Sequence, residues 1–296
     1  MRAMFPESGE GRPPEQGSRL VLLGTAGGPR VHGERSGPAQ VITAGGGVYL
    51  VDCGYGVLRR LLEAGISPVS VEHLFITHHH SDHNLDLGAL ILLSWTAGRT
   101  RKLNIWGPPP LEEIVGALVK AHDYDITTRT ADEERPSLES LLSVHEIRRP
   151  GPVMVDDRVR VSCALVHHPP VEPAFAFRFD AGDRSFVISG DTVPSESLVG
   201  LAAGADVLVH EVLHEPSVPA ILGRFPNPEP LRRHLLASHT TTDEVGVIAR
   251  RAGVGTLVLS HLAPADSRLV SRDQWLERPT DSFPGPVILG EDLLTI

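Results

Sequence analysis

The chain has 296 residues, of which 41% are hydrophobic and 22% charged, and its formal net charge is −10. This composition is typical of a folded globular protein, and the longest apolar run, Leu87 to Trp95, is far shorter than the roughly 20 residues of a membrane span. The acidic excess disfavours a general electrostatic attraction to nucleic acid, and two cysteines, Cys53 and Cys163, exclude a disulfide framework and a thiolate zinc site.

The N-terminal residues 1–18 are rich in proline, glycine and glutamate and lack the apolar stretch of a secretory signal. We therefore predict a disordered tail over residues 1–18, one domain over residues 19–296 and a cytoplasmic protein.

In the first half of this domain, short apolar runs alternate with glycine-rich turns and a few helical patterns. The apolar runs predict strands over Arg19–Thr25, Gln40–Ala44, Val48–Asp52, His73–Thr77 and Leu103–Trp106. Apolar residues at helical spacing predict helices over Val57–Gly65, Asp86–Trp95 and Leu111–His122. The charged segment Arg129–Ser140 is predicted to be a surface loop.

The second half repeats this organisation. Strands are predicted over Leu142–Ile147, Val153–Val166, Ala174–Phe179, Ser185–Ser189, Asp206–His210 and Thr256–Ser260. Thr241 and Glu244 form a capping box for a helix through Ala252, and Glu215–Leu236 is a connector or a lid. Strands followed by helices in both halves predict an α/β core of two sheets flanked by helices.

The segment from Thr77 to His83, THHHSDH, carries the chemistry. It delivers His78, His80, Asp82 and His83 from the end of a buried strand into a turn, where two pairs of ligands can reach two neighbouring cations. A solvated loop without a cation is the alternative, but imidazoles packed this closely repel one another when protonated. His79 occupies a spacer position and is expected to be a bystander.

Further candidate ligands lie at the ends of other predicted strands. His167 and His168 follow one strand, Asp191 follows the next, and His261 follows the last. A histidine at one strand end is more often structural. Three such sites beside the THHHSDH loop favour a shared site for two metal ions.

With Asp52 in VDCG, these residues make the chain resemble the metallo-β-lactamase fold superfamily from about Leu20 to the C-terminus. Three further segments, LGTAGGPR from Leu23, HEV from His210 and SHTT from Ser238, resemble one branch of it. That branch holds transfer-RNA 3′-processing endonucleases, arylsulfatase-like enzymes and cyclic phosphodiesterases. The resemblance implies a four-layer αββα sandwich, with two mixed sheets between helices, as the catalytic domain.

The resemblance also implies roles for single residues. One metal ion is expected on His78, His80 and His168, the second on Asp82, His83 and His261, with Asp191 between them; His167 remains an alternative to His168. Asp52 is expected to hold the ligand loop through hydrogen bonds, or to be a buried structural residue. Asp82, His239 and Glu211 are the expected catalytic residues, with His239 a general acid that Glu211 orients or else a structural histidine. His214 and His234 are expected to be ordinary surface residues, with a place on the rim of the same site as the alternative.

The ligand set determines the predicted reaction. Imidazole and carboxylate ligands suit two zinc ions, and manganese or iron fit too. Water between two such ions becomes a competent nucleophile near neutral pH. We therefore predict a metal-dependent hydrolase that cleaves an ester-type bond by attack of a metal-bridging hydroxide.

The expected substrate follows from a short connection. Only 22 residues lie between His168 and Asp191, which leaves no room there for the long arm by which many transfer-RNA-processing relatives grip RNA. With the acidic net charge, this favours a small-molecule ester, phosphodiester or sulfate first and lactone or carboxylic ester next, and makes nucleic acid unlikely. A transfer-RNA 3′-processing endonuclease and a non-catalytic metal-binding or partner-binding protein are the alternatives, and the resemblance also suggests a homodimer.

Overall fold

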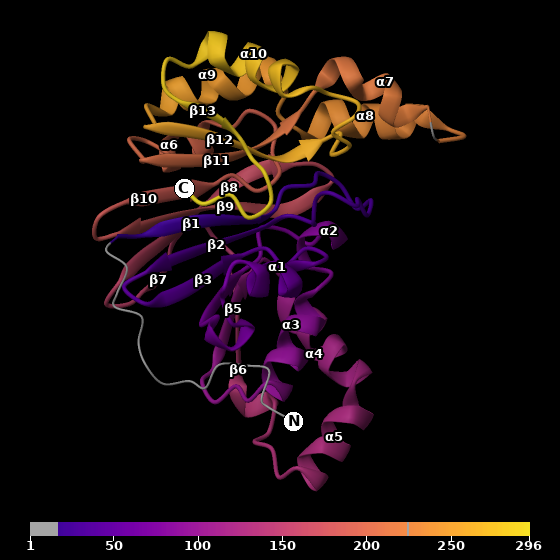
Figure 1. Cartoon of the computed structure of the whole chain (residues 1–296), viewed down its shortest axis with the longest axis vertical. Helices are drawn as coiled ribbons and strands as arrows, with labels where there is room; N and C mark the ends of the chain where they lie inside the picture. Colours follow the sequence, from indigo (N-terminus) through magenta and orange to yellow (C-terminus); the bar gives the residue numbers. More distant parts are fainter. Residues whose placement is uncertain (1–16, 224) are drawn as a thin grey trace.

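The two predicted sheets form the middle layers of the molecule (Figure 1). The structure is a computed structural model and describes residues 17–223 and 225–296. The predicted tail therefore lies outside the described residues except for Gly17 and Ser18. Ser18 is buried and not part of a tail, because its backbone N and its hydroxyl donate to Asp183 at 2.7 and 2.6 Å.

The first sheet has six strands in sequence order. They are β1 (Arg19–Gly24), β2 (Ala39–Ala44), β3 (Gly47–Val51), β4 (His73–Phe75), β5 (Leu103–Gly107) and β6 (Leu142–Glu146). The first three strands pair antiparallel and β3 to β6 pair parallel, so the sheet is mixed.

The second sheet has seven strands in reverse sequence order, from β13 to β7. They are β7 (Gly151–Val155), β8 (Val159–His168), β9 (Val171–Ala181), β10 (Ser185–Ile188), β11 (Val207–Leu213), β12 (Thr256–Ala263) and β13 (Val287–Leu289). Strands β7 to β10 pair antiparallel and β10 to β13 parallel. The connection between His168 and Asp191 is β9, a turn and β10, as predicted.

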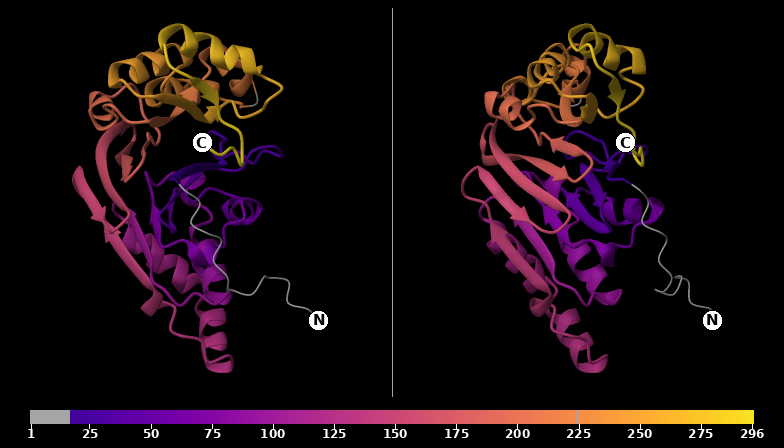
Figure 2. Two further views of the ribbon diagram at one scale, coloured as in Figure 1. Left: turned by 60° about the vertical axis from the view of Figure 1, so that its left-hand side comes forward. Right: turned by 90° about the vertical axis from the view of Figure 1, so that its left-hand side faces the viewer.

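Helices cover the outer face of each sheet (Figures 1 and 2). On the first sheet lie α1 (Val57–Glu63), α3 (Leu87–Thr96) and α4 (Leu111–Ala121), with α2 (Ser81–Asn84), α5 (Asp123–Asp132) and the short 3-10 turns Pro68–Ser70 and Glu139–Leu141 in the connections. On the second sheet lie α6 (Glu196–Leu201), α9 (Thr242–Ala252) and α10 (Arg272–Ser282). The turn Glu215–Ser217, α7 (Val218–Leu222) and α8 (Pro228–Ser238) lie at one side of this layer. The αββα prediction is confirmed. None of the helices in residues 17–223 and 225–296 is long and apolar enough to cross a membrane.

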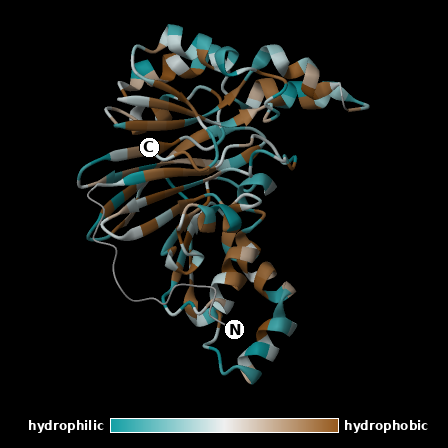
Figure 3. Cartoon of the chain, in the orientation of Figure 1, coloured by the Kyte–Doolittle hydropathy of each residue, from teal (hydrophilic) through white to brown (hydrophobic). Residues whose placement is uncertain are grey.

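The alternation of strand residues assigns each side chain to a layer. Leu20 and Leu22 of β1 face the second sheet, whereas Val21 and Leu23 face the helices. Between the sheets, Phe75 meets Phe179 edge to face with ring centroids 5.2 Å apart. Hydrophobic residues accordingly run along most strands of the two sheets (Figure 3). This buried alternation fixes the strand register and therefore which residues stand at the strand ends.

Three predicted segments differ from the structure. The expected loop Arg129–Ser140 begins inside α5, whose last turn is held by the ion pair between Arg129 and Asp125. The strand expected over Val153–Val166 is a hairpin, because Asp156 accepts from the backbone N of Arg158 and of Val159 and turns the chain. The connector Glu215–Leu236 folds into α7 and most of α8.

The base of β4 is anchored by a buried cation, Arg99, which is 2% exposed. Its guanidinium donates to Ser94 Oγ at 3.0 Å and to the carbonyl oxygens of Val71 and Pro68 at 2.9 and 2.7 Å. Burial lowers the pKa of Arg99 to about 10. The side chain ties α3 to the segment that leads into β4, and therefore to the strand that delivers the histidine loop.

We expect Arg99→Ala to lower the free energy of unfolding by about 3 kcal/mol, because it leaves the buried carbonyl group of Val71 and the half-buried one of Pro68 without this donor and empties a buried site. Urea denaturation followed by circular dichroism measures this. The matched control is Arg101→Ala, whose side chain is 80% exposed and pairs with Glu72 at the surface, so its cost should stay below about 1 kcal/mol. Equal costs for the two variants would contradict the anchoring role.

Candidate metal centre

The histidine loop is shaped by Asp52, at the end of β3. Asp52 has a positive φ of 59°, and its Oδ1 accepts from the backbone N of Thr77 at 2.8 Å. Its Oδ2 accepts from His83 Nδ1 at 2.8 Å. This bond fixes the tautomer of His83 and leaves Nε2 facing the other predicted ligands. Asp52 therefore holds both ends of the loop, as expected from the sequence.

The first predicted ligand group is assembled. His78, His80, His168 and Asp191 each offer one ligand atom, and these atoms lie within 4.8 Å of one another. His80 Nδ1 is 3.1 Å from His78 Nε2 and 3.1 Å from His168 Nε2. Asp191 Oδ2 lies 3.9 Å from His78 Nε2 and 3.8 Å from His168 Nε2. Three imidazoles and one carboxylate oxygen thus surround a common point.

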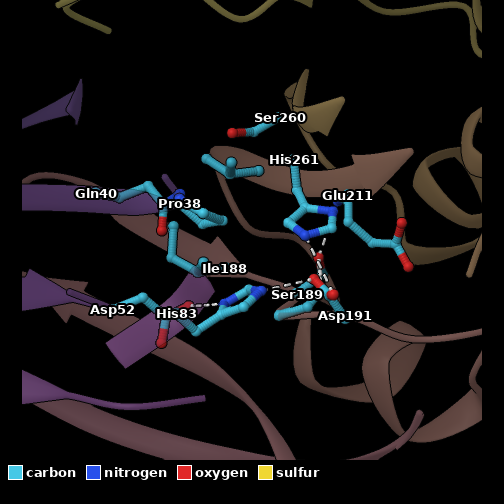
Figure 4. A pocket seen from close by; sticks show the side chains of 12 residues that line it. Pro38, Gln40, Asp52, His83, Ile188, Ser189, Asp191, Glu211, Ser260 and His261 are labelled. Carbon is cyan, nitrogen blue, oxygen red and sulfur yellow. Dashed lines mark hydrogen bonds and ion pairs between the residues drawn. The ribbon is translucent and has the colours of Figure 1, made fainter. Parts of the chain in front are cut away.

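Asp191 also stands beside the second predicted group, and Figure 4 shows it with two members of that group, His83 and His261. The ligand atoms of Asp82, His83 and His261 again lie within 4.8 Å of one another. Asp191 Oδ1 is 3.4 Å from His83 Nε2, and Asp191 Oδ2 is 3.2 Å from His261 Nε2. His261 Nε2 also lies 3.4 Å from Asp82 Oδ2. Asp191 therefore reaches both groups, which is the position expected of a bridging ligand.

A β-bulge aims His261 at this cluster. In the pairing of β11 with β12, Glu211 faces Ser260 but Val212 faces Leu262, so His261 is an extra residue with a φ of 44°. Leu259 and Leu262 both lie in the helix-side core, whereas regular alternation would have placed His261 there. The sequence predicted a strand that ends at His261. The strand continues to Ala263, and the bulge turns the imidazole out of it.

The alternative ligands, His167 and His168, are the last two residues of β8, and only one of their side chains is buried. The side chain of His167 is 60% exposed and does not lie in the cluster. His168 is 1% exposed, and its Nδ1 donates to the carbonyl oxygen of Ser238 at 2.8 Å, which leaves Nε2 free toward His80. His79 also lies apart, with Nε2 donating to the carbonyl oxygen of Pro108 at 2.7 Å.

The electrostatics of the two groups differ. Burial, together with the neighbouring His168, lowers the pKa of His80 to about 4, and burial lowers the pKa values of His78 and His168. These imidazoles are therefore neutral, which is the form that binds metal. Burial also opposes charge on His83, but the carboxylates of Asp191, Asp52 and Asp82 together raise its pKa well above the usual value. The carboxylate-rich half thus attracts positive charge.

Unpartnered buried atoms test whether a cation fits. His83 Nε2 and Asp191 Oδ1 are both buried and make no hydrogen bond in the described part of the chain. Buried polar atoms without a partner are costly, and both atoms face the second group of ligands. The donor set of imidazole nitrogen and carboxylate oxygen without sulfur suits zinc, manganese or iron. The clusters therefore suit a metal site.

His239 and Glu211 form a pair at the edge of the cluster. His239 Nδ1 donates to Glu211 Oε1 at 3.1 Å, and the ring of His239 stacks on that of His261 with centroids 5.8 Å apart. Burial lowers the pKa of His239, but Glu211, and beyond it Asp191 and Asp82, raise it to about 9. His239 is therefore protonated at neutral pH in the metal-free protein. Its ring stands beside the ligands of both groups.

The sequence misplaced two histidines that it expected at the surface. His234, expected at the surface, is half-buried, and its ring centroid lies 5.9 Å from that of His168 and 5.8 Å from that of His239. It lies one helical turn before Ser238 on α8, a helix that the sequence did not reveal. His214, also expected at the surface, is buried at 7% exposed, because the turn Glu215–Ser217 folds over it and its Nδ1 lies 2.6 Å from Ser217 Oγ. It lies outside the ligand groups.

Comparison with known proteins places the chain in a family. A family model described as "Anti-Pycsar protein Apyc1" matches residues 19–246. A ribonuclease Z of Mycobacterium bovis is 37% identical over 277 residues, which span 93% of this chain and 96% of that relative. Two solved structures each cover 94% of this chain and 98% of their own at 20% identity: the metallo-β-lactamase fold protein YhfI from Bacillus subtilis, with a TM-score of 0.69, and the short form of human tRNase Z, with 0.68.

The expectation of a small-molecule substrate, with nucleic acid unlikely, is wrong, because the relatives that match nearly the whole chain are ribonucleases. The short connection between His168 and Asp191 does not distinguish the chain from them. The alignment of 277 residues is almost the same length as the part of this chain that it covers. Insertions in the relative are therefore short, and they leave no room for a long extra arm. Net charge misled because it sums over the whole surface, whereas RNA contacts one patch. The chain belongs to the hydrolases of the metallo-β-lactamase fold, in the family that the Apyc1 model describes and alongside the mycobacterial ribonucleases Z.

Proposed function

We propose that this protein is a metal-dependent endonuclease that cleaves the phosphodiester backbone of precursor transfer RNA at its 3′ end. The observation that carries the proposal is the position of Asp191 between two groups of ligands, with Oδ2 at 3.8 Å from His168 Nε2 of the first group and at 3.2 Å from His261 Nε2 of the second. The ribonuclease Z relatives support RNA as the substrate, since they match from one end of the chain almost to the other. This was the alternative reading of the sequence.

In this proposal His78, His80 and His168 would hold one cation, Asp82, His83 and His261 would hold the second, and Asp191 would serve both. Zinc is the expected ion, and manganese and iron also suit the ligands. Two such cations would supply a nucleophile by lowering the pKa of water to roughly 7 and would offset charge on the phosphoryl group.

The residues of the chain then handle the leaving group. A phosphodiester releases an alkoxide, which needs a proton as the bond to phosphorus breaks. His239 is buried beside the cluster, and Glu211 fixes its Nδ1–H, so Nε2 is the nitrogen that remains to donate a proton. Glu211 Oε1 also accepts from the backbone N of Thr192 at 3.0 Å, which holds the carboxylate next to Asp191. His239 is the proposed general acid and Glu211 its positioning residue.

We expect His80→Ala and His168→Ala to purify with less than two metal ions per chain, whereas the neighbouring variants His79→Ala and His167→Ala retain the wild-type content. The reason is that His79 and His167 point away from both ligand groups. Elemental analysis after dialysis measures the content. Loss of metal from the two neighbouring variants to the same extent would contradict the assignment.

We expect the wild-type enzyme to cleave a precursor transfer RNA transcript that carries a 3′ trailer, and chelation followed by dialysis to abolish cleavage. Denaturing gel electrophoresis with end-labelled transcript gives the position of the cut. Asp191→Asn is the inactive control, since it weakens both ligand groups. No cleavage by saturating, metal-loaded enzyme would overturn the proposed substrate.

The role of His239 predicts a dependence on the leaving group. We expect His239→Ala to lower kcat on RNA by about 100-fold or more, but to have much less effect on bis(p-nitrophenyl) phosphate, because nitrophenolate leaves without a proton. Steady-state kinetics on both substrates, with metal content measured in parallel, checks this. An equal loss on both substrates would indicate a structural histidine, and His167→Ala is the control that should change neither rate.

A further inference from the structure

A pocket of about 360 Å³ opens directly from the candidate metal centre. His239 and His261 form its inner wall, and its outer wall is apolar, with Ile221, Phe225, Leu231 and Leu235 contributed by α7, α8 and their connection. Pro29 and Leu269 close the opposite side. A volume of this size suits a ring-bearing group of a substrate, and an apolar wall suits the faces of its ring.

The pocket continues into a second hollow of about 310 Å³ that is lined by polar residues. Arg30 and His32 belong to both hollows, so they stand where one passes into the other. Arg30 is exposed, and its guanidinium forms no ion pair within residues 17–223 and 225–296. The other arginine of the second hollow, Arg268, is neutralised by Asp266 at 2.8 Å. Among the described residues, Arg30 is therefore the arginine at the passage that is available to a ligand next to the apolar chamber.

We infer that the apolar pocket binds the base of the nucleoside that carries the leaving oxygen, stacked on Phe225, and that Arg30 contacts the next phosphate along the strand. This inference rests on the proposed function and names the subsite it uses. An alternation of apolar chamber and cation matches the alternation of base and phosphate in a single strand. A pocket for an isolated small ester would have no need of the second hollow.

The side of the scissile bond follows from His239. The general acid must stand at the leaving oxygen, and His239 forms part of the wall of the pocket. The nucleoside attached to that oxygen therefore extends into the pocket and away from the ligand groups. If cleavage leaves a 3′-hydroxyl, this is the nucleoside upstream of the cut.

The nature of the walls also predicts how the base is read. Phe225 is 50% exposed, so its ring face is available to a ligand. Apart from His239 and His261 of the inner wall, the polar side chains of the pocket are those of Arg30, His32 and Asp266, which also line the second hollow and so stand at the passage. Stacking on an aromatic ring is available to every base, whereas sequence readout requires hydrogen bonds to base edges. The pocket therefore favours the presence of a base and discriminates little among the four.

The test uses matched RNA substrates in which the nucleoside that carries the leaving oxygen either has its base or is abasic. We expect removal of the base to lower kcat/KM of the wild-type enzyme about 10-fold or more, but to change that of Phe225→Ala by less than 2-fold, because the stacking partner is already lost. The control is Leu236→Ala, since Leu236 also lies exposed on α8 but does not line the pocket. This variant should respond to base removal as the wild type does.

Affinity gives a second readout that does not depend on turnover. The cleavage product that ends in the leaving hydroxyl should bind the wild-type enzyme more tightly than the same oligonucleotide without its terminal base, as measured by fluorescence anisotropy. Phe225→Ala should abolish the difference, and Arg30→Ala should weaken both products equally and reduce the dependence of binding on salt. Because Phe225 is half exposed, its truncation should leave the unfolding transition in place, which circular dichroism checks.

The outcomes separate the subsite from the proposed function. If the wild-type enzyme cleaves RNA but Phe225→Ala remains as sensitive to base removal as the wild type, the subsite assignment is overturned while the endonuclease stands. If the wild-type enzyme cleaves no RNA, the proposed function is overturned, and the subsite assignment that rests on it is overturned with it. An abasic effect on the opposite side of the cut would overturn the assigned direction of the strand.

Discussion

The carboxylate of Asp191 is the interaction on which the candidate site depends. It lies 2% exposed among four imidazoles, those of His78, His83, His168 and His261. Burial opposes its ionisation, but His261 and His83 outweigh burial and hold its pKa well below the usual value. Two of these imidazoles lie on the loop that follows β4 of the first sheet, and the other two lie on β8 and β12 of the second sheet. The cluster therefore exists only when the sheets are stacked, which makes the packing between them a condition of the chemistry.

Glu211 links this cluster to the layer outside the second sheet. Its Oε1 accepts from His239 Nδ1, from the backbone N of Thr192 and from the backbone N of Thr240 at 3.1, 3.0 and 3.3 Å. One oxygen of β11 thus joins the segment after Asp191 to the turn between α8 and α9. The proposed general acid is fixed by the same bonds that close the domain around it, so its orientation needs no contact with substrate.

Much of the site could be predicted from sequence because its signals are local. The THHHSDH loop places several ligands within a few residues, and Asp191 and His261 follow buried strands that are evident from their apolar runs. The bulge that aims His261 could not be predicted, since it arises from the pairing of β11 with β12. The place of His234 depends on α8, whose exposed face carries little periodic signal. The substrate was misjudged because a summed charge does not reveal that Arg30 stands without an ion pair in the described part of the chain, beside the cluster.

The outer wall of the apolar pocket packs on a small core of its own. Val218, Leu222 and Leu235 gather with Leu213 and Ala263 in a cluster separate from the three that hold the sheets and their helices. Leu213 and Ala263 belong to β11 and β12, so this small core packs α7 and α8 directly against the strands that carry Glu211 and His261. A change in side-chain size in the wall of the pocket is therefore transmitted to the candidate metal centre, and the two parts must evolve in step.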